Sequence, residues 1–293
     1  YGELFNEINA NTGGIYSGVE VFDNENARDG FRAMFSVRGK ALYPKMAFLF
    51  TMIREILETS KLEDTGRLYE IVAQVKSRAQ ENLVSAGHST AVLRGASYTS
   101  PMAAFQDEMA GVGYYHFIEK LEKEFDERKE ELVSSLKKLM KRILRPEYFH
   151  VSYTGERESL ENVKSLCKEL KKHLCKEQAE TFGEAIICQK KNEGLKTSGQ
   201  VQYVAQTGNF CKKGLSYTGA LDILKVALSY DYLWMNLRVK GGAYGCMSSF
   251  NRLGDGYFVS YRDPNLEKTN EIYEGITQYL RQFDVSDRDM TKY

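Results

Sequence analysis

The chain has 293 residues, of which 42% are apolar and 27% are charged, a composition typical of a globular protein with room for about two domains. Its 40 basic and 40 acidic side chains give a formal net charge of zero. No electrostatic argument therefore favours a nucleic acid or an anionic membrane as a partner. No apolar stretch approaches the ~18–20 residues of a membrane-spanning helix, so we expect binding to neither nucleic acid nor membrane.

The first half of the chain predicts a strand hairpin between helices, followed by a run of long helices. A helix is expected at residues 5–10, and two alternating strands after Gly13-Gly14 end near Phe22 and Val37. Apolar residues at three-to-four spacing then predict amphipathic helices. Their ranges are 42–60, 64–86, 88–96, 100–110 and 117–144.

The second half mixes strands and helices around a second double glycine, Gly241-Gly242. Strands are predicted where β-branched and aromatic residues alternate, at 147–154, 185–188 and 200–206. Helices are predicted at 159–174 and 217–237. A strand ending at Phe250, another beginning near Tyr257 and a helix from Asn265 follow the double glycine.

The two double glycines belong to a repeated unit. Gly13 and Gly241 lie 228 positions apart, and so do Tyr16 and Tyr244. A copy at so long a period predicts two domains of one fold rather than a short-repeat solenoid. We place them at residues 1–176 and 177–293. Hairpins interrupted by long helices favour an α+β fold of two-layer sandwiches, with mainly antiparallel sheets and helices packed on one face.

The sequence contains no complete motif for a metal site or for a catalytic nucleophile. His116 and Glu119 suggest an inverted zinc motif, H-x-x-E-H, but Lys120 stands where the second histidine would be. The other histidines stand alone, and neither G-x-S-x-G nor G-x-x-x-x-G-K occurs. We therefore expect no metal ligands in this chain and no catalysis by the chain alone.

The five cysteines form a scattered set without a C-x-x-C pair. They predict neither a disulfide framework nor a zinc knuckle and indicate a reducing compartment, either the bacterial cytoplasm or a mitochondrial or other organelle matrix. The helix pattern that Ser286 opens stops within two turns, so we expect the sequence to be a fragment of a longer protein. The cysteines are Cys167, Cys175, Cys188, Cys211 and Cys246.

The run from Arg238 through Gly241-Gly242 to Tyr244 places a cation and a phenol on either side of a double glycine. From spacing alone, this is an ordinary helix end with a solvated arginine followed by a turn. The run itself and two other stretches, 9–15 and 260–266, closely resemble the C-terminal half of the insulinase-like (pitrilysin-type) zinc peptidases, in their presequence-protease-like branch. The likeness covers nearly the whole chain.

The resemblance implies a metalloendopeptidase that degrades unstructured peptides and is built from four similar α+β domains. Zinc would be bound by an H-x-x-E-H motif in an N-terminal half that this chain lacks. That half, with zinc and a glutamate, would activate the attacking water, and the two halves would close around an unfolded peptide. This chain would be the third domain and the first part of the fourth.

Residue by residue, the resemblance makes Arg238 and Tyr244 substrate and transition-state contacts, with Gly241 and Gly242 in the substrate-binding run. Ala10 stands where the first copy would need the arginine, so that copy is expected to be structural. Two alternatives stay open: a zinc-free structural subunit of the same fold, or a peptide-binding module acting beside a zinc-bearing partner chain.

Overall fold

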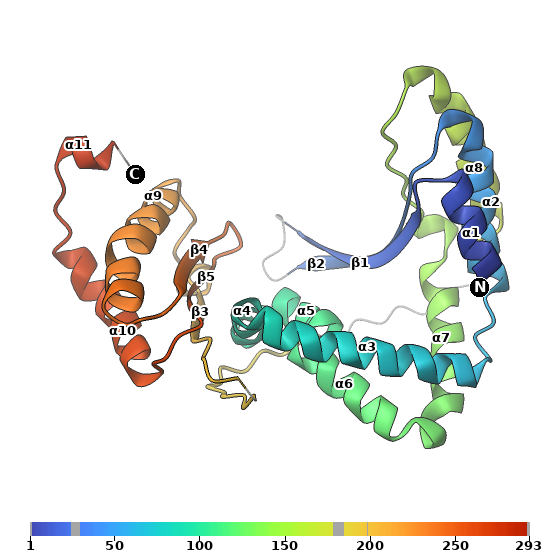
Figure 1. The fold of residues 1–293 in the computed structure, drawn as a ribbon. Coiled ribbons are helices and arrows are strands. Elements are labelled where there is room, and N and C mark those ends of the chain that lie inside the picture. The colour runs from blue at the N-terminus through green and yellow to red at the C-terminus, as the bar shows by residue number, and fades with distance from the viewer. Residues whose placement is uncertain (1, 25–29, 178–184, 198, 292–293) are drawn as a thin grey trace. The chain divides into compact units, whose positions relative to one another are not determined.

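The computed structural model describes the whole chain except residues 1, 25–29, 178–184, 198, 292 and 293 (Figure 1). The chain divides into two compact units. The first comprises residues 1–22, 32–71 and 123–184, and the second comprises residues 23–31, 72–122 and 185–293. Each unit contains helices and paired strands, so the predicted α+β class is confirmed. The predicted domain division after residue 176 stays a prediction.

The first unit is a two-stranded hairpin beside several helices. Strands β1 (Ile15–Asp23) and β2 (Phe31–Gly39) pair with each other. The hairpin is closed at its base, where the Gly13 N–H donates to the Lys40 carbonyl at 2.6 Å and the Lys40 N–H donates to the Gly14 carbonyl at 3.3 Å. The helices are α1 (Gly2–Asn11), α2 (Met46–Thr59), α7 (Phe125–Ile143) and α8 (Leu160–Lys172), with α3 (Thr65–Ser85) shared between the units and 3-10 turns η1 (Tyr43–Lys45), η2 (Pro146–Tyr148) and η3 (Arg157–Ser159).

The second unit is organised around a three-stranded antiparallel sheet. Strands β3 (Ala205–Asn209), β4 (Gly245–Phe250) and β5 (Asp255–Tyr261) lie in the order β3-β5-β4. Its helices are α4 (Gly87–Ser97), α5 (Pro101–Ala110), α6 (Val112–Lys123), α9 (Ala220–Ala227), the π-helix η5 (Leu228–Val239), α10 (Glu267–Arg281) and α11 (Asp287–Met290), with the 3-10 turn η4 (Cys211–Lys213). Across the described residues, every helix is too short or too polar to cross a membrane.

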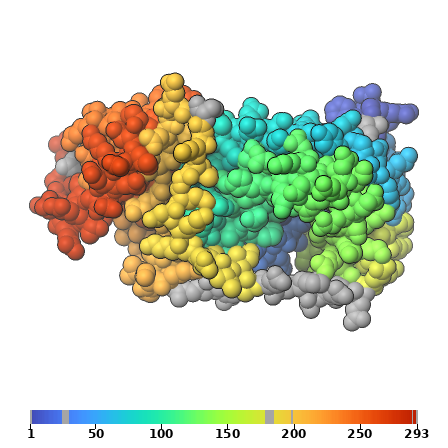
Figure 2. All heavy atoms as spheres, turned by 90° about the horizontal axis from the view of Figure 1, so that it is seen from below, coloured from blue at the N-terminus to red at the C-terminus, as the bar shows by residue number. Residues whose placement is uncertain are grey.

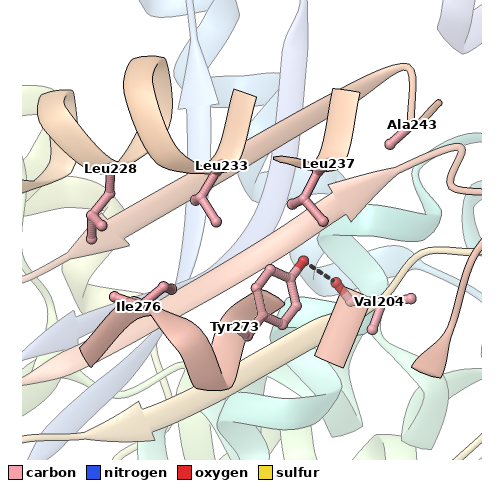
Figure 3. Packing of buried hydrophobic residues seen from close by; sticks show 7 residues of the cluster. All are labelled: Val204, Leu228, Leu233, Leu237, Ala243, Tyr273 and Ile276. Carbon is pink, nitrogen blue, oxygen red and sulfur yellow. Dashed lines mark hydrogen bonds between the residues drawn. The ribbon is translucent and has the colours of Figure 1, made fainter. Parts of the chain in front are cut away.

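One face of this sheet carries the core of the second unit. Three leucines of η5, each at most 1% exposed, point toward α10 and the start of β3 (Figure 3). The buried Tyr273 hydroxyl donates to the Val204 carbonyl at 2.9 Å, which satisfies both polar groups in an apolar setting (Figure 3). Burying a leucine contributes about 1.5–3 kcal/mol. The core residues are Val204, Leu228, Leu233, Leu237, Ala243, Tyr273 and Ile276.

Helix α4 covers the opposite face of the same sheet. Side chains alternate along a strand, so Tyr261 points away from the face of its buried neighbour Ser260. The His88 ring of α4 meets the Tyr261 ring edge to face, with centroids 4.9 Å apart. The sheet is therefore covered on both faces, and α4 adds a layer to the predicted two-layer arrangement.

Charged groups hold the segment before β3 against α4. The Arg94 guanidinium donates to the Glu193 carboxylate at 2.6 Å and to the buried Asp107 carboxylate at 2.7 Å. The first of these bonds holds the pKa of Glu193 below its usual range. Burial, followed by the hydrogen bond to Glu193, raises the pKa of Tyr98 to about 12. In Figure 2 this segment, in yellow, runs beside the blue-green helices of the same unit.

The predicted helix at 117–144 is two helices. The chain breaks at Glu124, whose backbone leaves the helical region (φ −103°, ψ 20°), and α6 begins five residues earlier than predicted. Asp107 explains the early start, since its carboxylate accepts the N–H groups of Val112 and Gly113 at 3.0 and 3.1 Å and caps the helix. The sequence pattern does not show this cap because Asp107 belongs to the preceding helix.

Three strand predictions need correction. Residues 147–154 form no strand: their start is the 3-10 turn η2, and no described strand pairs with the rest. Residues 185–188 likewise belong to no described strand. The strand predicted at 200–206 is β3, displaced to Ala205–Asn209, with a single bridge from Gln202 to Asp263 before it. Alternation marks a half-buried extended segment, but only a partner strand makes it a β-strand.

The predicted helix at 217–237 is also divided. It begins as α9 and continues as the π-helix η5. Apolar content alone does not separate the two segments, but the buried leucines of η5 are spaced five and four residues apart, as suits the wider turn of a π-helix; they are Leu228, Leu233 and Leu237. Long π-helices are rare, and short ones are frequent at functional sites.

Candidate functional site

The candidate site lies where η5 ends in the double glycine. Arg238 is in the last turn of η5. Two backbone bonds close the helix: the Gly242 N–H donates to the Arg238 carbonyl at 3.1 Å, and the Ala243 N–H donates to the Leu237 carbonyl at 2.9 Å. A glycine turn of this kind satisfies carbonyls that a helix end would leave without partners.

Local structure accounts for both glycines. A Cβ at Gly241 would lie 2.6 Å from the Leu237 carbonyl oxygen, closer than real contacts allow. Gly242 has φ +83°, in the left-handed region that favours glycine. The Asn265 amide group then donates to the Gly241 carbonyl at 2.7 Å and holds the turn against the loop after β5. The predicted contact of both glycines with substrate stays a prediction.

The structure brings Arg238 and Tyr244 together. The guanidinium carbon of Arg238 lies 5.7 Å from the centre of the Tyr244 ring and 4.1 Å from the centre of the Trp234 ring. Trp234 precedes Arg238 by one helical turn. No carboxylate lies within ion-pair distance of Arg238 in the described part of the chain. Arg238 is exposed, and among the described residues its guanidinium has ring contacts but neither an ion pair nor a hydrogen bond.

Tyr244 has a fixed backbone and an available hydroxyl. Its N–H donates to the carbonyls of Tyr261 and Arg262, at 3.0 and 3.3 Å. The residue is 65% exposed, and its ring contacts the Tyr261 ring at a steep angle, with centroids 5.8 Å apart. Among the described residues, no group bonds to its hydroxyl, so the O–H can donate to a ligand.

A buried carboxylate braces the loop that supports Tyr244. Asp263, only 1% exposed, accepts the Thr269 hydroxyl at 2.7 Å and the Asn265 N–H at 2.9 Å. Arg262, just before it, has φ +49°, a conformation that side-chain-bearing residues rarely adopt. Its guanidinium lies over the Tyr261 ring at 5.5 Å. Strained residues of this kind cluster at functional sites.

Aromatic contacts continue from Tyr244 through Tyr261 to His88 and Tyr203. His88 is also unusual because its Nδ1 is buried without a hydrogen-bond partner in the described structure. The Tyr203 ring lies 5.6 Å from that of Tyr261. Sequence reasoning did not select Trp234, Tyr261 or His88 as site residues. Only Trp234 carried a usable signal, since residues four apart on a helix are neighbours.

Neither a metal site nor an activated thiol is found at this surface. Within the described ranges, no three His, Cys, Asp or Glu side chains are grouped to hold a metal ion. His116 is exposed on α6, with its Nδ1 4.0 Å from Glu119. Burial raises the pKa of the Cys246 thiol to about 11, against a smaller opposing effect of Arg238, so this thiol stays neutral near neutral pH.

Comparison with known families accounts for most of the chain. Residues 1–121 match a family model for a region associated with peptidases of family M16, subgroup C, and residues 192–293 match the PreP C-terminal domain. These two regions make up most of the chain, and both are similar to the C-terminal half of presequence-protease-like peptidases of the insulinase type. The resemblance that the motifs predict is therefore confirmed, and the matched region is the C-terminal half of the proteins of that family.

Curated relatives match the chain over nearly its full length. Protein HypA of Clostridium perfringens is 38% identical over 100% of the chain, presequence protease 1 (chloroplastic/mitochondrial) of Arabidopsis thaliana is 30% identical over 97%, and mitochondrial presequence protease of Yarrowia lipolytica is 26% identical over 99%. The chain spans 30%, 26% and 30% of their respective lengths.

Proposed function

We propose that this chain supplies the peptide grip and part of the chamber wall of a presequence-protease-like endopeptidase that degrades unstructured peptides. The observation that supports the proposal is the pairing of Arg238 with Tyr244 beside a rigid glycine turn, with donor groups that have no partner among the described residues. The substrate class comes from the family and from the printed names of the presequence protease relatives.

The two side chains suit a peptide backbone. A guanidinium is always charged and offers planar N–H donors, which suit main-chain carbonyls beside the bond to be cleaved. A tyrosine hydroxyl, already oriented by its ring contacts, suits the oxyanion that develops when that carbonyl is attacked. Both groups are donors, so they stabilise negative charge on substrate oxygens and take up no proton.

Zinc belongs to the proposal only through residues outside this chain. The family implies a zinc ion, but the described residues offer no ligand set for it, and His116 lacks the partner histidine that an inverted zinc motif needs. We therefore expect an N-terminal, zinc-bearing half of the same protein to be the partner of this chain. The expected compartment is the bacterial cytoplasm or an organelle matrix.

Replacing Arg238 in the complete enzyme tests the proposal. Arg238→Ala is expected to lower kcat/KM for an unstructured peptide by at least ~10-fold, because a donor to the reacting carbonyl is lost. Arg252→Ala is a matched control, since Arg252 is an exposed arginine of the same unit that lies over the Tyr217 ring at 6.0 Å. It should leave turnover unchanged.

Wild-type turnover in a folded Arg238→Ala enzyme would contradict the proposed role. Absence of turnover in the complete wild-type protein, together with retained peptide binding, would instead favour the alternative of a zinc-free structural or peptide-binding subunit.

A further inference from the structure

We propose that Trp234 is a positioning residue that holds the Arg238 guanidinium flat beside Tyr244, so that its N–H edge faces a bound peptide. This inference rests on the proposed function of Arg238 and extends it to a residue that does not itself touch the reacting atoms.

The contact between Arg238 and Trp234 is unusually close. The Arg238 guanidinium carbon lies 4.1 Å from the Trp234 ring centre, closer than the other cation–ring contacts of the described residues, which lie between 5.3 and 6.0 Å. Indole is the strongest of the aromatic partners for a cation. Trp234 is also the only tryptophan of the chain. Tyr244 adds a second, looser ring contact to the same guanidinium at 5.7 Å.

A ring contact orients an arginine and leaves its N–H donors available. A carboxylate partner would orient an arginine by occupying its N–H edge and would offset its charge. An aromatic ring contacts the face of the guanidinium and leaves the in-plane donors available. Arg238 has ring contacts and no ion pair in the described structure. This arrangement suits an arginine whose donors must stay available for substrate carbonyls.

Trp234 and Arg238 both project from η5, whose buried side packs into the core. Trp234 is 36% exposed, although the leucines on either side of it in the sequence, Leu233 and Leu237, are buried in the core. The buried leucines fix the helix against the sheet, so Trp234 presents its ring from a rigid support. Without that ring, the exposed arginine side chain would sample several rotamers and only a fraction would face the peptide.

Substitutions of Trp234 in the complete enzyme test the inference. Trp234→Leu keeps apolar volume but removes the ring face, and we expect kcat to fall about 2- to 30-fold with little change in KM, the range that a cation–π contact supports. Trp234→Phe restores a ring and should recover part of the loss. Met235→Ala, at a comparably exposed neighbour on η5, is the control and should retain wild-type turnover.

A double-mutant cycle separates positioning from simple packing. If Trp234 acts through Arg238, the Trp234→Leu/Arg238→Ala enzyme will be no slower than Arg238→Ala alone. Losses that multiply independently, or wild-type kcat in Trp234→Leu, would overturn the inference while leaving the role of Arg238 intact. Wild-type turnover in Arg238→Ala would overturn the proposed function, and the inference with it.

Discussion

The two double-glycine turns of the molecule lie in the same order of elements and differ in the side chains before them. In each, a helix leads into two glycines, the second with positive φ, at +106° for Gly14 and +83° for Gly242. A tyrosine, a strand pair and another helix follow in both: β1, β2 and α2 in the first unit, and β4, β5 and α10 in the second. The 228-residue repeat seen in the sequence thus has a matching local structure.

The helix ends before the glycines are different. At the same offset of 228 positions, the first unit has Ala10 where the second has Arg238, and Asn6 where the second has Trp234. The first turn ends an α-helix, and the second ends the π-helix η5. The glycine turn therefore occurs in both units, and the proposed substrate contacts depend on two side chains that only the second unit has, Trp234 and Arg238. The first unit also supplies an internal control for each substitution.

The largest expected effect is the loss of the Tyr244 hydroxyl. Tyr244→Phe in the complete enzyme is expected to lower kcat for peptide cleavage by about 10²- to 10³-fold, as when one oxyanion donor is removed. The ring contact with Tyr261 is kept, so folding should not change. Tyr16→Phe is the matched control at the equivalent position of the first turn, and its kcat should equal that of the wild type.

Equal losses at both positions would show that the tyrosines act through the fold, and the contrast between the turns would then fail. An unchanged kcat in Tyr244→Phe would remove Tyr244 from the proposed site and leave Arg238 to be tested separately.

The elements that the sequence predicted well are those with a local cause. Three-to-four spacing predicted α2 and α8, and the double glycines predicted both turns. The segment 147–154 was predicted wrongly because its alternation says nothing about whether a partner strand exists. Local spacing also predicted that Arg238 and Tyr244 flank one turn.

The surroundings of that pair depended on contacts between distant parts of the sequence. His88 meets Tyr261 through the packing of α4 on the sheet, and no pattern near either residue indicates it. The brace formed by Asp263 follows from its burial, which only the fold reveals. Trp234 is the exception, since its spacing of four residues from Arg238 is visible in the sequence and makes the two side chains neighbours on a helix.

An intermediate effect is expected from the glycines with positive φ. Gly242→Ala and Gly14→Ala should each destabilise their own unit by about 1–2 kcal/mol, because a side chain disfavours the left-handed region. Gly14→Ala should be the worse of the two, since the φ of Gly14, +106°, lies farther than that of Gly242, +83°, from the left-handed region that a residue with a side chain can adopt. Hydrogen exchange of the amides in β1 and β4 measures each unit separately. If Gly242→Ala leaves stability unchanged while Gly14→Ala lowers it, the backbone of the second turn adjusts to a side chain and that of the first does not.

The smallest expected effect comes from Arg262, the one non-glycine residue with positive φ in the described structure. It ends the second hairpin, and the first hairpin has no such residue among those described. Arg262→Gly and Arg262→Ala remove the same side chain, but only glycine relieves the backbone, so Arg262→Gly should be the more stable by about 1 kcal/mol. Thermal unfolding of the two variants measures this difference. The Arg262 carbonyl accepts the Tyr244 N–H, so a relaxed loop should also move Tyr244. We therefore expect Arg262→Gly to have a lower kcat than Arg262→Ala, although it is the more stable of the two variants. If stability and kcat instead rise together, the strain at Arg262 does not serve Tyr244, and the difference between the two hairpins is structural.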